Sequence, residues 1–103
     1  MYKICVFVPK ADAESVKQAM FAAGAGKIGA YDSCCWQTNG QGQFRPLSGS
    51  SPTIGEQGQI ETVAEFRIEM VCDDKFIQDT VAALRNSHPY EEPAYDVWRL
   101  EDF

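Results

Sequence analysis

The order of hydrophobic patterns along the chain is the feature that most limits its fold. Residues 2–9, "YKICVFVP", alternate in character and end at Pro9, which predicts a strand. The next pattern repeats at helical spacing: Asp12 can cap it, Glu14 suits its first turn, and Gly24 stops it. An amphipathic helix of about three turns therefore follows the first strand.

The middle of the chain has the composition of a β-hairpin. We expect a strand around 30–38, a tight turn at Asn39-Gly40 because this pair readily takes positive φ angles, and a short return strand around 42–47 near a sheet edge. Residues 48–58 have no period and are rich in Gly and Ser, which predicts an exposed loop. A loop of about a dozen residues is long enough to indicate a function or a partner.

The second half of the chain repeats the strand and helix patterns. The clearest strand runs from about 62 to 72, with apolar residues alternating with charged ones. A second amphipathic helix begins after Asp73 or Asp74 and ends near Ser87. After the stretch "HPYEEP", alternating residues 94–100 predict the last strand.

These patterns predict one α+β domain over residues 1–103, a ferredoxin-like βαββαβ sandwich. Its two helices would cover one face of an antiparallel sheet. The other face would present Phe7, Trp36 and Trp98, which is a large aromatic surface to leave in water. We therefore expect a homo-oligomer that buries this face.

Composition excludes several partners. Nine Lys and Arg face fifteen Asp and Glu, giving a net charge of −6, and no basic cluster is present to bind nucleic acid. No apolar run approaches the roughly 20 residues needed to span a membrane, and the first residues lack a signal peptide pattern, so we expect a cytoplasmic protein. The four cysteines match neither a zinc motif nor a disulfide framework, so free and mostly buried thiols are expected.

The stretch "NSHPYEEPAYDVWRL" holds the strongest candidate site. His88, Glu91 and Glu92 could bind a divalent cation such as zinc, copper or manganese, and Cys34 or Cys35 could add a thiolate ligand from another strand or subunit. The alternative is a structural corner, since His-Pro and Glu-Pro both favour extended backbone before a strand. A nucleophilic pair of Cys35 with His88 is less favoured, because nothing in the sequence orients the imidazole.

Two further patterns have a structural explanation beside a functional one. "GAGKIG" fits G-x-G-x-x-G, but a helix precedes it, so the context of a dinucleotide site is reversed and helix termination and a tight turn explain it better. Tyr31, Tyr90 and Tyr95 could line a pocket for a planar ligand with the tryptophans, although aromatic residues in strands more often form core or interface.

Three motifs read in order carry a family resemblance: "GAGKIGAYDSCCW", "PTIGEQGQIETVAEFRIE" and "HPYEEPAYDVWRLED". They resemble the YqfO-type domain inserted in bacterial members of the Ngg-one-interacting-factor-three family, which is often labelled type 2 GTP cyclohydrolase I. "HPYEEPAYDV" is also similar to the HPYE corner of CutA, the divalent-cation-tolerance protein. The resemblance implies a CutA/PII-like domain, and such domains characteristically form trimers.

The resemblance does not carry the cyclohydrolase activity with it. In the longer relatives the two-metal site belongs to a flanking domain rich in His, Asp and Glu, whereas this sequence has one His. Within the inserted domain the family has no firmly assigned catalytic residues, and its role is regulatory or concerned with assembly. Lys27 stands where some relatives carry another polar residue such as His, which argues against a metal role for that turn.

The leading hypothesis is a cytoplasmic, non-enzymatic homotrimer that binds a metal ion or small ligand at an intersubunit corner. Its metal ligands would be His88, Glu91, Glu92 and Cys35, and its ligand-binding residues Tyr90, Tyr95 and Lys27. The second hypothesis is an interaction domain that docks through loop 48–58 on a separate metal-dependent hydrolase. The third is a small enzyme acting on a nucleotide, supported by the family label alone. The sequence identifies neither the ligand nor the roles of Cys34 and Cys35.

Overall fold

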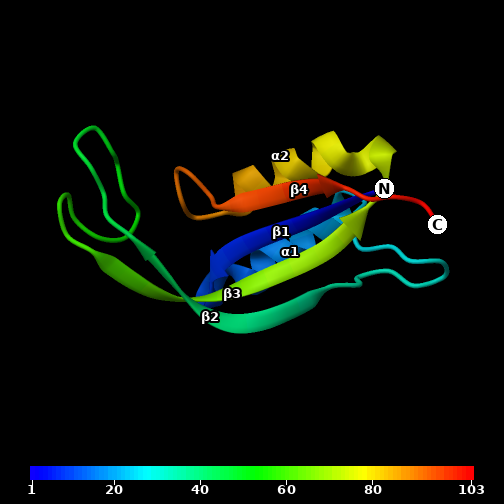
Figure 1. Ribbon diagram of the computed structural model, residues 1–103, viewed down its shortest axis with the longest axis horizontal. Coiled ribbons are helices and arrows are strands. Elements are labelled where there is room, and N and C mark those ends of the chain that lie inside the picture. Colours follow the sequence, from blue (N-terminus) through cyan, green and yellow to red (C-terminus); the bar gives the residue numbers. More distant parts are fainter.

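The computed structural model describes all 103 residues. Its helices and strands follow the predicted order β-α-β-β-α-β (Figure 1). The elements are β1 (Tyr2–Pro9), α1 (Ala13–Ala22), β2 (Trp36–Phe44), β3 (Glu61–Cys72), α2 (Ile77–Ser87) and β4 (Tyr95–Arg99). Neither helix has the length and apolar character needed to span a lipid bilayer.

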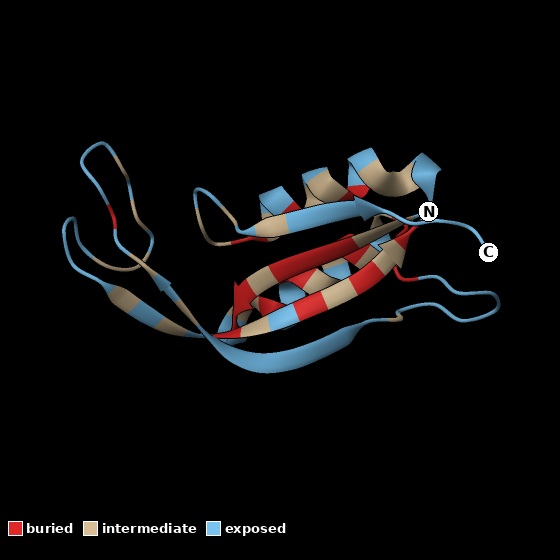
Figure 2. Ribbon diagram, in the orientation of Figure 1, coloured by how far each residue is buried: buried red, intermediate tan, exposed pale blue.

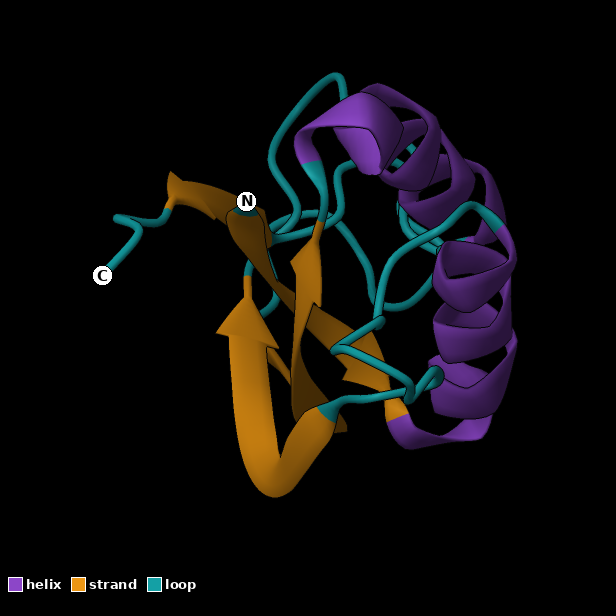
Figure 3. Ribbon diagram, turned by 90° about the vertical axis from the view of Figure 1, so that its right-hand side faces the viewer, coloured by secondary structure: helices purple, strands orange, loops and turns teal.

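The four strands form one antiparallel sheet in the order β2-β3-β1-β4, with β1 and β3 in the middle. Both helices pack on the same face of this sheet (Figure 3). This arrangement confirms the predicted α+β, ferredoxin-like fold. The last strand lies at an edge beside the first, as the split βαβ pattern requires.

The hydrophobic core lies between the sheet and the helices. Ile4, Val6 and Val8 of the central strand are fully buried, and they alternate with residues on the opposite face, as the period of a strand requires (Figure 2). The other main members of the core come from β3, α1 and α2, namely Ile68, Met70, Cys72, Ala13, Val16, Met20 and Leu84.

Both helices begin with a short 3-10 turn. Lys10–Asp12 precedes α1, and Asp74–Phe76 precedes α2. Asp12 occupies the N-cap position of α1 and Asp73 that of the second turn, but neither side chain forms a capping hydrogen bond. The predicted start points are therefore correct, while the expected side-chain caps are absent.

The end of α1 follows the Schellman pattern, in which a left-handed residue lets two amides bond back to the last turn. Gly24 has φ of +119°. Its N–H donates to the carbonyl of Phe21, and the N–H of Ala25 donates to the carbonyl of Met20. The predicted stop at Gly24 is confirmed, and the glycine is required because an L side chain disfavours this φ.

The predicted hairpin over residues 30–47 is wrong. Asn39-Gly40 does not turn but lies inside β2, where Asn39 pairs with Phe66 and Gly40 with Glu65. All nine residues of β2 find partners on β3. This long pairing overrides the local turn preference of the Asn-Gly pair, because it satisfies the backbone groups of the whole segment.

Strand β3 is longer than its neighbour β1, and the excess builds an arm. Glu65–Cys72 pairs with β1, whereas residues 61–64 pair with β2 alone. The two strands therefore project beyond the body of the sheet and end in the loop of residues 45–60 (Figure 1). The predicted loop 48–58 lies within this segment, and the arm makes the molecule elongated, 46 × 25 × 24 Å.

The face of the sheet opposite the helices is uncovered, as predicted. Trp36 and Trp98 point to this face and are 61% and 45% exposed. Phe7 lies on the same face, nearer to the arm, and is half-buried. Cys5 also belongs to this face, in the middle of the sheet, where its neighbours bury it.

All four cysteines are free, as predicted, although only Cys5 and Cys72 are buried. Burial raises the pKa of both thiols. A thiol with a raised pKa carries little thiolate at neutral pH and is therefore a poor nucleophile. Cys34 is half-buried and Cys35 is exposed.

We predict that Gly24→Ala destabilises the fold more than Gly29→Ala. Both glycines have positive φ, so both variants incur the backbone cost, but a Cβ at Gly24 would lie 2.5 Å from the Phe76 ring and one at Gly29 would meet nothing. The difference in unfolding free energy should be about 1–3 kcal/mol, measured by urea denaturation. Equal losses would show that the packing of Phe76 on this turn contributes nothing.

Candidate functional site

The chain turns sharply after α2, at the corner formed by residues 88–94. His88 is the first residue beyond the helix, with φ −74° and ψ 138°, and its N–H still donates to the carbonyl of Leu84. Extended backbone is the conformation that a following proline enforces, so Pro89 ends the helix here. The corner leads directly into β4 at Tyr95.

The imidazole of His88 fixes the corner to the central strand. Its Nε2 lies 2.8 Å from the carbonyl oxygen of Phe7, and its Nδ1 lies 3.1 Å from the backbone nitrogen of Tyr90. Nδ1 thus accepts from the amide of Tyr90 while Nε2–H donates to Phe7. The side chain is 7% exposed, so both ring nitrogens are occupied inside the protein.

Tyr90 connects this corner to the arm. Its ring packs 5.8 Å from that of Phe44 and 5.0 Å from that of His88, measured between centroids. Its hydroxyl donates a hydrogen bond to Oε2 of Glu65 at 3.1 Å. Burial first, and then the neighbouring Glu65 carboxylate, raise the pKa of the Tyr90 phenol.

Glu65 is a buried carboxylate at the base of the arm, and it is 8% exposed. It belongs to the uncovered face of β3, and its side chain lies against the backbone of the neighbouring strand at Gly42. A Cβ at Gly42 would come within 2.0 Å of Glu65 Oε1. A glycine inside a strand often marks such a close approach, and here it creates the space that the carboxylate occupies.

Two hydrogen bonds join the loop of the arm to the corner. The N–H of Ser51 donates to Glu91 Oε2 at 2.6 Å, and the hydroxyl of Thr53 donates to the carbonyl of Pro89 at 2.7 Å. Segments some 40 residues apart in sequence therefore close on each other. The loop therefore lies against the corner, although it is far from it in sequence.

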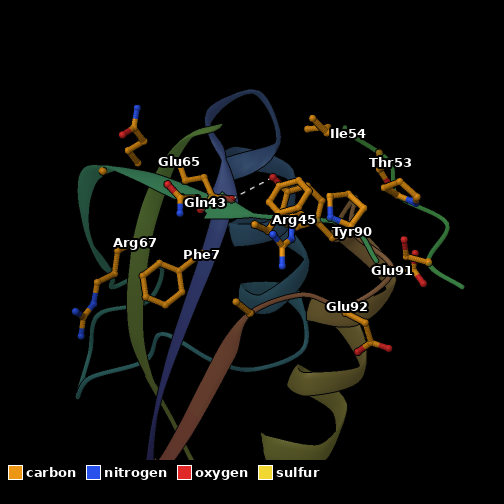
Figure 4. A pocket seen from close by; sticks show the side chains of 18 of the residues that line it. Phe7, Gln43, Arg45, Thr53, Ile54, Glu65, Arg67, Tyr90, Glu91 and Glu92 are labelled. Carbon is orange, nitrogen blue, oxygen red and sulfur yellow. Dashed lines mark hydrogen bonds between the residues drawn. The ribbon is translucent and has the colours of Figure 1, made fainter. Parts of the chain in front are cut away.

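A cleft of about 750 Å³ opens between the arm, its loop and the corner (Figure 4). This volume falls within the range of sites for small molecules. Its walls come from β1, β2, the loop, β3 and the corner, and the labelled side chains of Figure 4 belong to these five segments. They are Phe7, Gln43, Arg45, Thr53, Ile54, Glu65, Arg67, Tyr90, Glu91 and Glu92.

The structure brings together only part of the predicted ligand-binding set. Tyr90 lines the cleft. Tyr95 lies at the start of β4, where its hydroxyl accepts from Arg85 at 3.2 Å. Lys27 lies in a separate shallow hollow beside Tyr31, with its Nζ 5.7 Å from the centre of the Phe76 ring.

The predicted metal ligands are not assembled within one chain. Glu91 and Glu92 line the cleft, but His88 has both nitrogens occupied. Cys35 directly precedes β2, and the segment before β2 lies at the opposite end of the sheet from the corner (Figure 1). No three His, Cys, Asp or Glu side chains form a group that could hold a metal ion. The same separation excludes a nucleophilic pair of Cys35 with His88 in one chain.

Sequence reasoning missed the residues that complete the cleft, mainly Phe44, Glu65 and Arg67. Glu65 and Tyr90 are 25 positions apart in sequence, so no spacing rule connects them. The one sequence signal for Glu65 was Gly42, because a glycine inside a strand often marks a close approach of another group. The turn expected at Asn39-Gly40 placed Gly42 at the start of a short return strand, so this signal was not recognised.

Known proteins similar to this chain share its fold. No protein-family model matches it. A protein of Mycobacterium tuberculosis named GTP cyclohydrolase 1 type 2 homolog is 46% identical over 98 residues, which is 95% of this chain and 26% of the relative. A Bacillus subtilis protein of the same name is 44% identical over 99 residues, 96% of this chain and 26% of the relative. The chain thus spans about a quarter of the length of these relatives.

Solved structures with a similar fold include a protein related to NIF3 and a CutA protein. A Bacillus cereus protein related to NIF3 superposes with a TM-score of 0.83 at 40% identity, over 98% of this chain and 26% of that one. CutA from Xylella fastidiosa superposes with a TM-score of 0.70 at 19% identity, over 99% of this chain and 85% of that one.

The fold places the chain among the CutA/PII-like α+β domains. Within this fold, the chain belongs with the Ngg-one-interacting-factor-three (NIF3) proteins, since it is homologous to a part of them about 100 residues long. This relationship confirms the family resemblance of its three motifs.

We predict that Tyr90→Phe changes the response of stability to alkaline pH. The folded state holds the phenolic proton more tightly than the unfolded state, whose pKa is about 10. The stability from this proton is therefore complete below pH 10 and is lost as pH rises further. The variant has no phenol to titrate, so the stability advantage of the unaltered protein should shrink as pH rises above about 10, the ordinary pKa of a phenol.

Urea denaturation at each pH measures this effect, and Tyr31→Phe is the matched control because Tyr31 is 74% exposed. The control should stay parallel to the unaltered protein. A constant gap between the unaltered protein and Tyr90→Phe would show that Tyr90 does not hold its proton against Glu65.

Proposed function

We propose that this chain is a non-enzymatic CutA/PII-like module that binds a small ligand in the cleft between the arm and the corner, and that it regulates or assembles a larger system. The observation that carries the proposal is the cleft itself: about 750 Å³, with aromatic walls and a buried carboxylate. Pockets with mostly apolar walls and a few placed polar groups are typical of small-molecule sites.

The rigid corner supports binding rather than catalysis. His88 is fully engaged by Phe7 and Tyr90, so it is not available as a general base or nucleophile activator. The pKa of Tyr90 is raised, which is the wrong direction for a phenolate base. These groups instead hold the walls of the cleft in position, which favours a preorganised binding site.

A homotrimer is the assembly that we propose, and the cytoplasm is the location. The family resemblance implies trimers, and the uncovered sheet face offers an apolar surface around Trp36 and Trp98. A metal site completed by Cys35 of another subunit is the version of the metal hypothesis that remains.

The second candidate is an interaction domain that docks on a separate hydrolase. The observation in its favour is that the longer relatives carry about three quarters of their length outside the matched region and are named GTP cyclohydrolase 1 type 2 homolog. The loop of residues 48–58 would be the docking element. A nucleotide-processing activity of the chain itself has only this name in its support.

Ligand binding is tested by screening a small-molecule library with amide resonances as the readout. Binders should shift the amides of the cleft and leave the hollow around Lys27 unchanged. Gly40→Leu should abolish these shifts, because a Cβ at Gly40 meets nothing within 4 Å and the added carbons would fill the cleft. Gln59→Leu adds a similar surface outside the cleft and should bind as before. Binding that survives Gly40→Leu would reject the cleft as the site.

Oligomeric state is tested by light scattering at micromolar concentration. We predict three times the 11.5 kDa mass of the chain. Substituting Trp36 and Trp98 together by Asp should produce monomers, because burying two carboxylates without partners is unfavourable. Tyr31→Asp should leave the mass unchanged. A monomeric unaltered chain would contradict the proposed trimer.

Titration calorimetry with zinc, copper and manganese separates the metal version from the small-ligand version. We expect no heat that depends on Cys35, Glu91 or Glu92, since no group of ligands is assembled within the chain. Heat that is lost in Cys35→Ser and in Glu91→Gln, with the trimer intact, would establish an intersubunit metal site instead.

A further inference from the structure

The charge of the cleft is not uniform from its floor to its mouth. Of the charged side chains that line it, Glu65 alone is more than nine-tenths buried, at 8% exposure. Glu91 and Glu92 are exposed, as are Arg45 and Arg67. The deep part of the cleft is therefore negative, while both signs occur at its mouth.

The carboxylate of Glu65 is oriented and partly free. Its Oε2 accepts the hydroxyl of Tyr90 at 3.1 Å. Its Oε1 accepts no hydrogen bond from the protein. No fully buried side-chain nitrogen or oxygen of the molecule lacks a hydrogen-bond partner. Oε1 must therefore be accessible, and the accessible space beside Glu65 is the cleft that it lines.

No basic side chain of the protein neutralises this carboxylate. Arg67 lies two positions further along β3, but its guanidinium pairs with Glu69 at 3.5 Å and lies 5.9 Å from the centre of the Phe7 ring. Figure 4 shows Arg67 directed away from Glu65. Arg45 forms no ion pair with any carboxylate of the cleft. A buried carboxylate is costly without a basic partner, so a cation bound from outside would stabilise this one.

The walls around this carboxylate are aromatic. Phe7, Phe44 and Tyr90 line the same cleft. Aromatic faces attract cations through their quadrupole, and they also accept the alkyl part of an organic cation. A bare metal ion would gain little here, since it needs several oxygen, nitrogen or sulfur ligands and no such group is present.

We propose that the cleft binds its ligand through a positively charged nitrogen, a protonated amine or a guanidinium, which donates to Oε1 of Glu65 while the carbon chain lies on the rings of Phe7, Phe44 and Tyr90. This inference rests on the proposed small-ligand function and gives the ligand its chemical class. The ligand enters from the mouth, where Glu91, held by the amide of Ser51, provides a second acceptor for longer cations.

Three probes of similar size and different charge test the proposal: n-butylammonium, butyrate and butanol. Amide resonances of the full chain are recorded during each titration. Butylammonium should shift the amides of Gly42, Glu65 and Tyr90, and it should bind at least about tenfold more tightly than butyrate or butanol, as charge-assisted hydrogen bonding predicts.

Two variants test the role of the carboxylate. Glu65→Gln keeps the shape of the side chain and removes its charge, so butylammonium binding should fall about tenfold while butanol binding stays unchanged. Gly42→Ala should also weaken butylammonium binding, because the new Cβ displaces the carboxylate; it keeps the test valid if Glu65→Gln does not fold. Glu56→Gln, outside the cleft, removes the same charge and should bind butylammonium normally.

The outcomes separate this inference from the function on which it rests. Tighter binding of butyrate would overturn the inference in favour of an anion held by Arg45, and equal binding of butanol would overturn it in favour of an apolar pocket. Both results leave a small-ligand cleft. Library ligands that still bind the Gly40→Leu variant would reject the cleft itself.

Discussion

The hydrogen bond from the buried imidazole of His88 to the carbonyl of Phe7 is the contact on which the candidate site depends. Phe7 belongs to β1, the strand that pairs with both β3 and β4. The bond therefore fixes the corner after α2 to the most firmly held part of the sheet. The other ring nitrogen holds the amide of Tyr90, so the phenol of Tyr90 is placed by the same side chain. Tyr90 in turn donates to Glu65, so the position of the corner also sets the hydrogen bond that this carboxylate receives.

The second determinant is the unequal length of the strands. Because β3 has twelve residues and β1 has eight, four residues of β3 extend beyond the body of the sheet and carry β2 with them. A two-stranded arm has no helix to cover it and would be marginally stable alone. Its loop is instead joined to the corner by Ser51 and Thr53, and the space enclosed between them is the cleft. The same geometry thus stabilises the arm and creates a place for a ligand.

The relationship to the longer NIF3 proteins gives these features a context. The chain matches about a quarter of the length of these relatives, and within it a packed body and exposed surfaces can be distinguished. In this chain the body is the helix-covered face of the sheet, while the uncovered face with Trp36 and Trp98 and the cleft beside the arm are both available for recognition.

The sequence alone determined the fold class, the order of the elements, the helix stop at Gly24, the uncovered aromatic face and the corner at His88-Pro89, because periodicity, glycine and proline act locally. It misplaced the turn at Asn39-Gly40, since pairing with β3 is a long-range interaction that outweighs a local preference. Of the residues predicted for the site, the structure brings Tyr90, Glu91 and Glu92 together at one cleft and leaves Lys27, Cys35 and Tyr95 outside its lining. Only the tertiary structure decided that His88 is occupied internally and that Glu65 faces the cleft, because these roles arise from contacts between segments 25 to 81 residues apart, which leave no spacing pattern in the sequence.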